Sequence, residues 1–430
     1  MGAHESTTLE NGMRVVSEHI EAVRSVAIGF WVGVGSRDER ASQAGASHLL
    51  EHLLFKGTTS YTAQDIAEIF DGLGGELNAA TTRELTVVHA RVLDDHLETA
   101  FDVMSDMVHS PTISDLASER EVVLEEIAMV EDAPQESIHD LSSQAIFGDH
   151  PLGRPVIGNA EVVSTVSRRA LGAYHRARYV PPNLVVAAAG HVDHDRLVRL
   201  VEQASRAKVK LSARKAAARR PVRSLPSATA AFQPKDTEQY HVCVGAPGVC
   251  RSDPRRFAAA VLDNVLGGTA SSRLFQEIRE KRGLAYSVYT FGTHYEDTGE
   301  IGVYVGTRAE NLGRCLELVG REFGAVRQGE LGEAELVRAK EHLKGRIMLS
   351  LESTVARMNR LGRAVIAETE LLSFDEVLAQ IDAVSGDDVV ALGSELFAPA
   401  RLSVAGIGPR GGDFRRAVCA VNPLLGEEAV

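Results

Sequence analysis

The second half of the chain repeats several segments of the first half. Residues 262–269, Leu-Asp-Asn-Val-Leu-Gly-Gly-Thr, resemble residues 51–58, Glu-His-Leu-Leu-Phe-Lys-Gly-Thr. Residues 397–406 resemble residues 179–188, since each segment places a proline between an aromatic residue and an apolar run. Repetition at corresponding places in both halves predicts two domains of the same architecture.

The length of the chain agrees with two domains. Its 430 residues exceed the size at which one hydrophobic core usually keeps growing, so two domains of roughly 200 residues are expected. Residues 206–230 interrupt the pattern with clustered lysine and arginine around Pro221 and Pro226, which is typical of a connector. We therefore place the first domain at residues 1–205, a basic linker at 206–230 and the second domain at 231–430.

The order of the expected elements favours an α+β fold. Strands come in consecutive pairs, at residues 13–18 and 26–32 and again at 76–81 and 85–91. Helical periodicity then dominates over residues 94–178. Runs of strands followed by runs of helices are typical of a mostly antiparallel sheet packed with helices, and not of a doubly wound parallel sheet.

Three ionisable side chains interrupt a mostly apolar segment, residues 45–55. In a helix, His48, Glu51 and His52 project from one side, because residues three and four apart are neighbours. Two imidazoles at this spacing can share one metal ion, and zinc most often accepts such ligands while leaving a position open for water. The order His-x-x-Glu-His is a zinc-peptidase motif, and a carboxylate beside that water would be its general base.

Two histidines make an incomplete site, because catalytic zinc usually takes three protein ligands. The acidic helix expected at residues 115–131 is the obvious source of the third. Glu119 and Glu126 are almost two whole turns apart and share a face, whereas Glu125 points about 100° away from Glu126. We predict Glu126 as the third ligand, and Glu119 as a residue that accepts a hydrogen bond from a ligand imidazole.

The second copy of the repeat lacks the metal motif. Ala259, Leu262 and Asp263 stand where the two histidines and the glutamate would be. Only the first domain can therefore bind the metal, and we expect one Zn²⁺ per chain.

These motifs resemble those of the inverzincin peptidases, the family of mitochondrial processing peptidase and its small bacterial relatives within the pitrilysin and insulin-degrading-enzyme clan. The resemblance covers nearly the whole chain. The segment from His48 to His52 matches the metal motif, and Val-Leu-Glu-Glu-Ile at residues 123–127 matches the segment with the third ligand. The resemblance implies zinc bound with the help of Glu126, an accompanying Glu119, and two similar α+β domains that form a clam-shell around a peptide substrate.

The resemblance also implies substrate contacts. The family places an arginine and a tyrosine seven residues apart that reach from the second domain toward the substrate, and these match Arg279 and Tyr286. Both side chains can donate hydrogen bonds to a peptide carbonyl and to the oxyanion that develops on it. The strand around Asn78, Ala79 and Ala80 is implied to pair with an extended substrate, which is a general way to hold a peptide.

The composition excludes several classes of protein. Hydrophobic residues make up 44% and charged residues 24%, which is ordinary for a folded globular chain. No apolar run approaches the roughly 18 residues that a membrane span needs, and a net charge of −13 argues against a nucleic-acid partner. The four cysteines are expected to be free thiols in a reducing compartment. With no secretory or transit signal at the N-terminus, we expect a cytoplasmic protein.

Our leading hypothesis is a zinc endopeptidase that hydrolyses peptides or unfolded segments in a chamber between the two domains. The alternative is a non-catalytic scaffold or assembly subunit, since the family also resembles core subunits of a respiratory complex that have lost peptidase function. A further alternative keeps the zinc but needs a partner chain. Because ligands, base and the arginine–tyrosine pair all occur in one chain, we favour a self-sufficient homodimer or monomer, and of these two we expect the homodimer.

Overall fold

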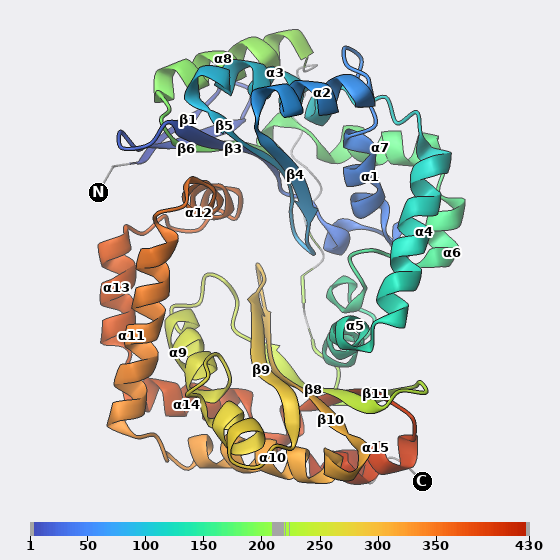
Figure 1. Ribbon diagram of the computed structural model, residues 1–430, viewed down its shortest axis with the longest axis vertical. Coiled ribbons are helices and arrows are strands. Elements are labelled where there is room, and N and C mark those ends of the chain that lie inside the picture. The colour runs from blue at the N-terminus through green and yellow to red at the C-terminus, as the bar shows by residue number, and fades with distance from the viewer. Residues whose placement is uncertain (1–3, 209–218, 220, 223, 427–430) are drawn as a thin grey trace. The chain divides into compact units, whose positions relative to one another are not determined.

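Two sheets organise the chain, and each forms the centre of a separate unit (Figure 1). The computed structural model describes residues 4–208, 219, 221–222 and 224–426. Unit 1 comprises Met1–Ala128, Pro155–Arg220 and Leu349–Leu371. Unit 2 comprises Met129–Arg154, Pro221–Met348 and Leu372–Val430.

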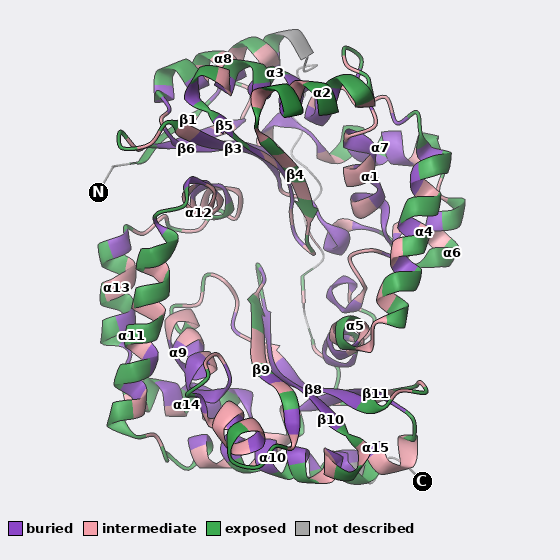
Figure 2. Ribbon diagram, in the orientation of Figure 1, coloured by how far each residue is buried: buried purple, intermediate pink, exposed green. Residues whose placement is uncertain are grey.

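The sheet of unit 1 is mixed but mostly antiparallel. β2 and β6 pair in parallel, and the other described neighbours pair antiparallel. The central strands are buried along their length, as their nearly continuous apolar sequences require (Figure 2). In spatial order the strands are β1 (His4–Thr8), β2 (Arg14–His19), β6 (Leu184–Gly190), β3 (Ser25–Val32), β5 (Thr86–Leu93) and β4 (Glu76–Thr81).

Helices build the main core of unit 1 on one face of this sheet. Their apolar sides meet side chains of the central strands, such as Ile28, Phe30 and Val186, in one buried cluster. The helices are α1 (Ala46–Leu54), α2 (Ala63–Leu73), α3 (Leu97–His109), α4 (Leu116–Asp132), α6 (Ala160–Thr165), α7 (Arg168–Arg178) and α8 (His194–Lys208).

Unit 2 repeats this plan. Its strands lie in the order β7 (Ala230–Pro234), β11 (Ser403–Gly408), β8 (Gln239–Gly248), β10 (Gly299–Arg308) and β9 (Ala285–His294), with β7 and β11 in parallel. Its helices include α9 (Arg256–Leu266), α10 (Leu312–Arg327), α11 (Glu333–Ser350), α13 (Phe374–Ala383), α14 (Gly386–Leu396) and α15 (Gly411–Val418), and a π-helix spans Phe275–Glu280.

Both units also contain short 3₁₀ helices. They lie at Ser36–Asp38, Ala41–Gln43, Asp94–His96, Pro151–Gly153, Pro181–Asn183, Ala309–Asn311, Pro399–Arg401 and Pro423–Gly426.

Each half of the sequence gives one helix to the sheet of the other half. α12 (Thr354–Ile366) packs on the second face of the unit 1 sheet, where Met358 and Leu361 contact a cluster that contains Trp31. α5 (Pro134–Phe147) packs in the same way on the unit 2 sheet, where Ile138 joins a buried cluster with Cys243. The expected division into residues 1–205 and 231–430 omits this exchange, because an apolar stripe shows that a helix is buried but not on which sheet.

A buried carboxylate fixes α12 to unit 1. Glu18 on β2 is 1% exposed, and it pairs with Arg357 and Arg360 of the helix. Arg14 on the same strand donates a hydrogen bond of 2.8 Å to the carbonyl of Val365. These contacts join residues more than 300 positions apart in the sequence.

The elements agree with the sequence analysis in type and largely in extent. The strands expected at 13–18, 26–32, 76–81 and 85–91 correspond to β2, β3, β4 and β5, and the α+β class with two similar, mostly antiparallel units is confirmed. The basic segment 206–230 lies partly outside the described residues. Its Arg219 belongs to unit 1, where the guanidinium pairs with Asp38 and donates to the carbonyl of Gly33.

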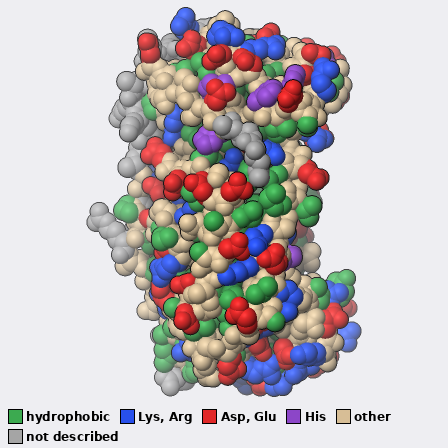
Figure 3. Space-filling view, turned by 90° about the vertical axis from the view of Figure 1, so that its left-hand side faces the viewer, with side chains coloured by type: hydrophobic (Ala, Val, Ile, Leu, Met, Phe, Trp, Pro, Cys, Tyr) green, Lys and Arg blue, Asp and Glu red, His purple; other side chains and the backbone are tan. Residues whose placement is uncertain are grey.

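The described surface carries charges of both signs. Figure 3 shows acidic and basic side chains interspersed over one face, so the net negative charge is not gathered there in one patch. Among the helices of the described residues, none is long and apolar enough to cross a membrane.

Candidate metal centre

The helix that carries the motif, α1, is held firmly at its N-terminus. Gly45 precedes it with φ 93°, and the carboxylate of Glu39 accepts hydrogen bonds from the backbone N–H groups of Gly45 (2.9 Å) and Ser47 (2.6 Å). A carboxylate at this position satisfies free N–H groups and complements the helix dipole. The apolar side of the helix is buried at Leu49, Leu50, Leu53 and Leu54, so the two histidines are left on the opposite, polar side.

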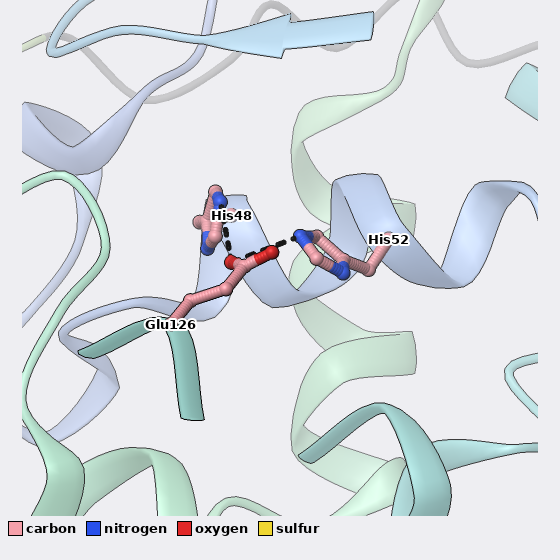
Figure 4. A group of neighbouring side chains, drawn as sticks. All are labelled: His48, His52 and Glu126. Carbon is pink, nitrogen blue, oxygen red and sulfur yellow. Dashed lines mark ion pairs between the residues drawn. The ribbon is translucent and has the colours of Figure 1, made fainter. Parts of the chain in front are cut away.

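The structure brings His48, His52 and Glu126 together. Figure 4 shows the Glu126 carboxylate of α4 facing both imidazoles of α1. Its Oε2 lies 3.7 Å from Nε2 of His48 and 3.5 Å from Nε2 of His52, and one ligand atom from each residue lies within 4.8 Å of the others. Nitrogen and oxygen atoms at about 2.0–2.1 Å from a tetrahedral zinc ion lie about 3.4 Å apart. The donor set and its spacing therefore fit zinc.

Behind these three residues, Glu119 lies beside one of the imidazoles. Its Oε2 lies 3.4 Å from Nδ1 of His52, while its Oε1 pairs with Nζ of Lys56 at 2.9 Å. Glu119 is 4% exposed, whereas Glu125 on the same helix is exposed. A buried carboxylate on Nδ1 fixes the imidazole so that its Nε2 is available to a metal.

Burial keeps His48 in the form that binds metal. Burial, with a smaller contribution from nearby His52, lowers the pKa of His48 from 6.5 to about 4. At neutral pH the imidazole is therefore neutral and has a lone pair to donate.

Glu51 occupies a separate environment on the same helix. The hydroxyl of Thr81, at the end of β4, donates a hydrogen bond of 2.5 Å to Oε2 of Glu51. Burial raises the pKa of Glu51, and the hydrogen bond from Thr81 opposes part of that rise. A carboxylate with a raised pKa beside a metal site is suited to accept and return a proton near neutral pH.

β4 forms an edge of the unit 1 sheet. Asn78, Ala79 and Ala80 pair with β5 on one side, and no described strand of unit 1 pairs with their other side. Exposure alternates along β4, as in a strand with one partly buried face.

A pocket of about 740 Å³ adjoins this strand. It could not be predicted from the sequence, because its lining comes from five separate segments. The apolar lining includes Phe55, Ile66, Phe70, Leu77 and Val355, and the polar lining includes Lys56, Asp71, Glu76, Asn78, His89 and Arg91.

The remaining site residues of the sequence analysis lie in unit 2. The guanidinium of Arg279, in the π-helix, stacks 4.5 Å from the ring centroid of Tyr286 on β9 and 4.7 Å from that of Phe275. Tyr286 is 76% exposed, so it does not pack in the core of the unit. The role of this pair toward a substrate remains a prediction.

The corresponding helix of unit 2 has no such site. On α9, Ala259 and Leu262 are buried among apolar side chains, and burial raises the pKa of Asp263. Across the described residues, the group on α1 and α4 is the one cluster of at least three histidine, cysteine or acidic residues with ligand spacing.

Comparisons with known proteins agree with this geometry. Residues 14–160 match the family described as insulinase (peptidase family M16), and residues 165–343 match the peptidase M16 inactive domain. A protein named as an uncharacterized zinc protease in Streptomyces coelicolor is 43% identical over 417 residues, which are 95% of this chain and 90% of that protein. One of the same description in Bacillus subtilis is 40% identical over 395 residues, 91% of this chain and 95% of the relative.

Solved structures share the fold. A protease from Helicobacter pylori superposes with a TM-score of 0.89 at 23% identity, covering 95% of this chain and all of that one. A protein from Pseudomonas fluorescens described as a peptidase M16 inactive domain gives 0.87 at 24% identity, over 95% and 98% of the two chains. The resemblance found in the motifs is thereby confirmed, and the chain belongs to peptidase family M16, the insulinase family.

Proposed function

We propose that this protein is a zinc-dependent endopeptidase that hydrolyses peptides or unfolded polypeptide segments. The observation that carries the proposal is the convergence of Nε2 of His48, Nε2 of His52 and Oε2 of Glu126, with the carboxylate of Glu51 on the same helix. The names of the relatives, which call them zinc proteases, support it.

In this proposal His48, His52 and Glu126 hold one Zn²⁺, which when bound would supply the Lewis acidity that makes water nucleophilic at neutral pH. Glu51 accepts the proton of the attacking water and passes it to the departing amine nitrogen. Its raised pKa supports this role, because a stronger base than an ordinary carboxylate takes the proton more readily.

The substrate is proposed to bind as an added strand. Asn78, Ala79 and Ala80 would pair their free edge with an extended peptide, and the pocket beside β4 would take one of its side chains. Arg279 and Tyr286 would donate hydrogen bonds to the scissile carbonyl and to the oxyanion that forms from it. The exposure of Tyr286 and the stacking of Arg279 on its ring suit this task.

A cytoplasmic location and a homodimer complete the proposal. The cysteines Cys243, Cys250, Cys315 and Cys419 are free, which suits a reducing compartment. Mass measurement of the purified chain tests the homodimer.

The test is the variant Glu51→Gln, assayed for zinc content and for cleavage of a random peptide mixture. We expect zinc to be retained and the cleavage rate to fall by about 10²–10⁴-fold. Glu125→Gln is the matched control, because Glu125 is exposed on α4 and should leave both properties unchanged. Undiminished cleavage by Glu51→Gln would refute the assignment.

Metal removal separates the enzyme from a scaffold. A chelator should abolish cleavage by the wild-type protein, and added zinc should restore it. Zinc binding without cleavage of any peptide in the mixture would instead favour the scaffold or assembly subunit.

A further inference from the structure

Thr81 connects the strand at the edge of the unit 1 sheet to the helix that carries the motif. It is the last residue of β4, and its hydroxyl lies 2.5 Å from Oε2 of Glu51 on α1. The two residues are 30 positions apart in the sequence, and their contact depends on the packing of α1 against β4.

The direction of this hydrogen bond follows from the neighbours of Thr81. A hydroxyl has one proton to donate. The hydroxyl of Thr86, which is paired with Thr81 across the strands, donates its own proton to the carbonyl of Val34 at 3.0 Å. The Thr81 and Thr86 oxygens are 3.4 Å apart, so the closer carboxylate of Glu51 is the acceptor for the proton of Thr81. Hydrogen bonds from a neutral donor to a carboxylate are among the stronger ones in proteins.

The backbone around Thr81 is itself fixed. The turn that follows begins with a hydrogen bond of 2.8 Å from Thr82 N to the carbonyl of Leu85. The carbonyl of Thr82 also accepts a hydrogen bond from the backbone N–H of Ser36. The sheet and this turn therefore fix the backbone from which the Thr81 hydroxyl reaches Glu51.

We infer that Thr81 is a positioning residue that holds one carboxylate oxygen of Glu51 and so leaves the other oxygen directed at the attacking water. This inference rests on the proposed role of Glu51 as the general base. Because Thr81 ends the strand whose edge would take the peptide, one strand positions both the substrate and the base. Loss of the hydroxyl should therefore slow the chemical step more than it weakens peptide binding, since a base displaced by about 1 Å can cost 10²-fold in rate.

The test uses Thr81→Val, which keeps the shape of the side chain and removes the hydroxyl, and Thr81→Ser, which keeps the hydroxyl. With the zinc-loaded protein and one fluorogenic peptide, kcat of Thr81→Val should fall by about 10- to 100-fold, while KM and zinc content stay near those of the wild type. Thr81→Ser should restore most of the lost kcat. Thr293→Val, at an exposed threonine on the edge strand β9, is the matched control and should behave as the wild type.

Several results would overturn the inference. These are a wild-type kcat for Thr81→Val, an equal loss in the valine and serine variants, and a rise in KM alone, which would assign Thr81 to peptide binding. Fluorescence of Trp31 checks that each variant folds, and Thr81→Ala replaces the valine variant if that one does not. Glu51→Gln, measured in parallel, keeps the two proposals apart: full activity there refutes the proposed base, whereas its loss together with a normal Thr81→Val refutes only the positioning role.

Discussion

Nδ1 of His52 and Oε2 of Glu119 lie 3.4 Å apart, on the side of the imidazole away from the nitrogen that faces Glu126. Glu119 is almost fully buried and also pairs with Lys56. Replacing the carboxylate by an amide removes the charge that favours this orientation of the imidazole. We expect Glu119→Gln to weaken zinc binding by about 10- to 100-fold. Competition with a chromogenic chelator measures the affinity.

The control for this measurement is Glu125→Gln, which changes the charge of the same helix at an exposed position. Equal zinc affinities in the two variants would show that the contact between Glu119 and His52 does not tune the site.

Gly362 and Trp31 determine how α12 packs on the unit 1 sheet. A Cβ atom at Gly362 would lie 2.1 Å from Nε1 of Trp31, which is itself 1% exposed. Alanine normally stabilises a helix relative to glycine by up to about 1 kcal/mol. At this position we expect Gly362→Ala to destabilise unit 1 by about 1–3 kcal/mol, because a packed contact must open. Gly345→Ala in α11 is the control, since nothing lies within 4 Å of that position.

The fluorescence of Trp31 reports this effect directly, because it is the single tryptophan of the chain. Urea unfolding followed by this signal should give a lower midpoint and a red-shifted native spectrum for Gly362→Ala. A native spectrum and midpoint like those of the wild type would mean that α12 does not pack on Trp31 in solution.

The residues of the candidate metal centre could be predicted from the sequence because their arrangement depends on local periodicity. His48 and His52 are one helical turn apart, and the two-turn spacing of Glu119 and Glu126 predicts a shared face of one helix. The structure brings these four side chains together. The hydrogen-bond partner of Glu51 could not be predicted from the spacing, because Thr81 contacts Glu51 only through the packing of β4 on α1.

For a related reason, the exchange of α5 and α12 between the two sheets could not be predicted from the sequence. The apolar stripes that contain Ile138 on α5 and Met358 on α12 predict burial of one helix face, and both are buried. Either stripe would suit either sheet, so the choice depends on close contacts such as that between Gly362 and Trp31. The ion pair between Arg219 and Asp38 could not be predicted either, because Arg219 lies in a run of basic residues that resembles a solvated connector.

The stability of the π-helix that carries Arg279 should depend on pH through the carboxyl group of Glu277. Hydrogen bonds from Lys281, and then from Arg321 and Arg282, lower the pKa of Glu277 from 4.5 to about 2. A carboxyl group with a lowered pKa stabilises the folded state while it is ionised. This stabilisation is fully present above about pH 4.5 and is lost as the pH falls from about 4.5 toward 2.

Hydrogen exchange of residues 275–280 measures this contribution. At pH 6 we expect the segment to exchange faster in Glu277→Gln than in the wild-type protein, and the difference should shrink as the pH falls through 4 toward 2.5. A difference that is constant over this range would contradict the lowered pKa. The exposed pair of Arg314 and Glu317 on α10 offers the control variant Glu317→Gln, which should leave the exchange of the segment unchanged.

Gly45 holds a backbone conformation that favours glycine at the start of the helix with the two histidines. Its φ of 93° lies in the left-handed region, and a Cβ atom there would lie 2.8 Å from the carbonyl oxygen of Ile157 and 2.9 Å from Val163. Gly74, at the end of α2, has φ 60° with nothing within 4 Å, so Gly74→Ala should cost only the left-handed backbone, about 1–2 kcal/mol. Gly45→Ala should cost this amount and a further 1–3 kcal/mol, roughly, for the forced contacts.

Gly45 directly precedes the helix that carries both histidines, so Gly45→Ala should also lower the affinity for zinc. Gly74→Ala should leave that affinity unchanged. Unfolding followed by tryptophan fluorescence and zinc competition measure the two effects, and equal losses of stability in the two variants would show that the loop at Ile157 yields to the added methyl group.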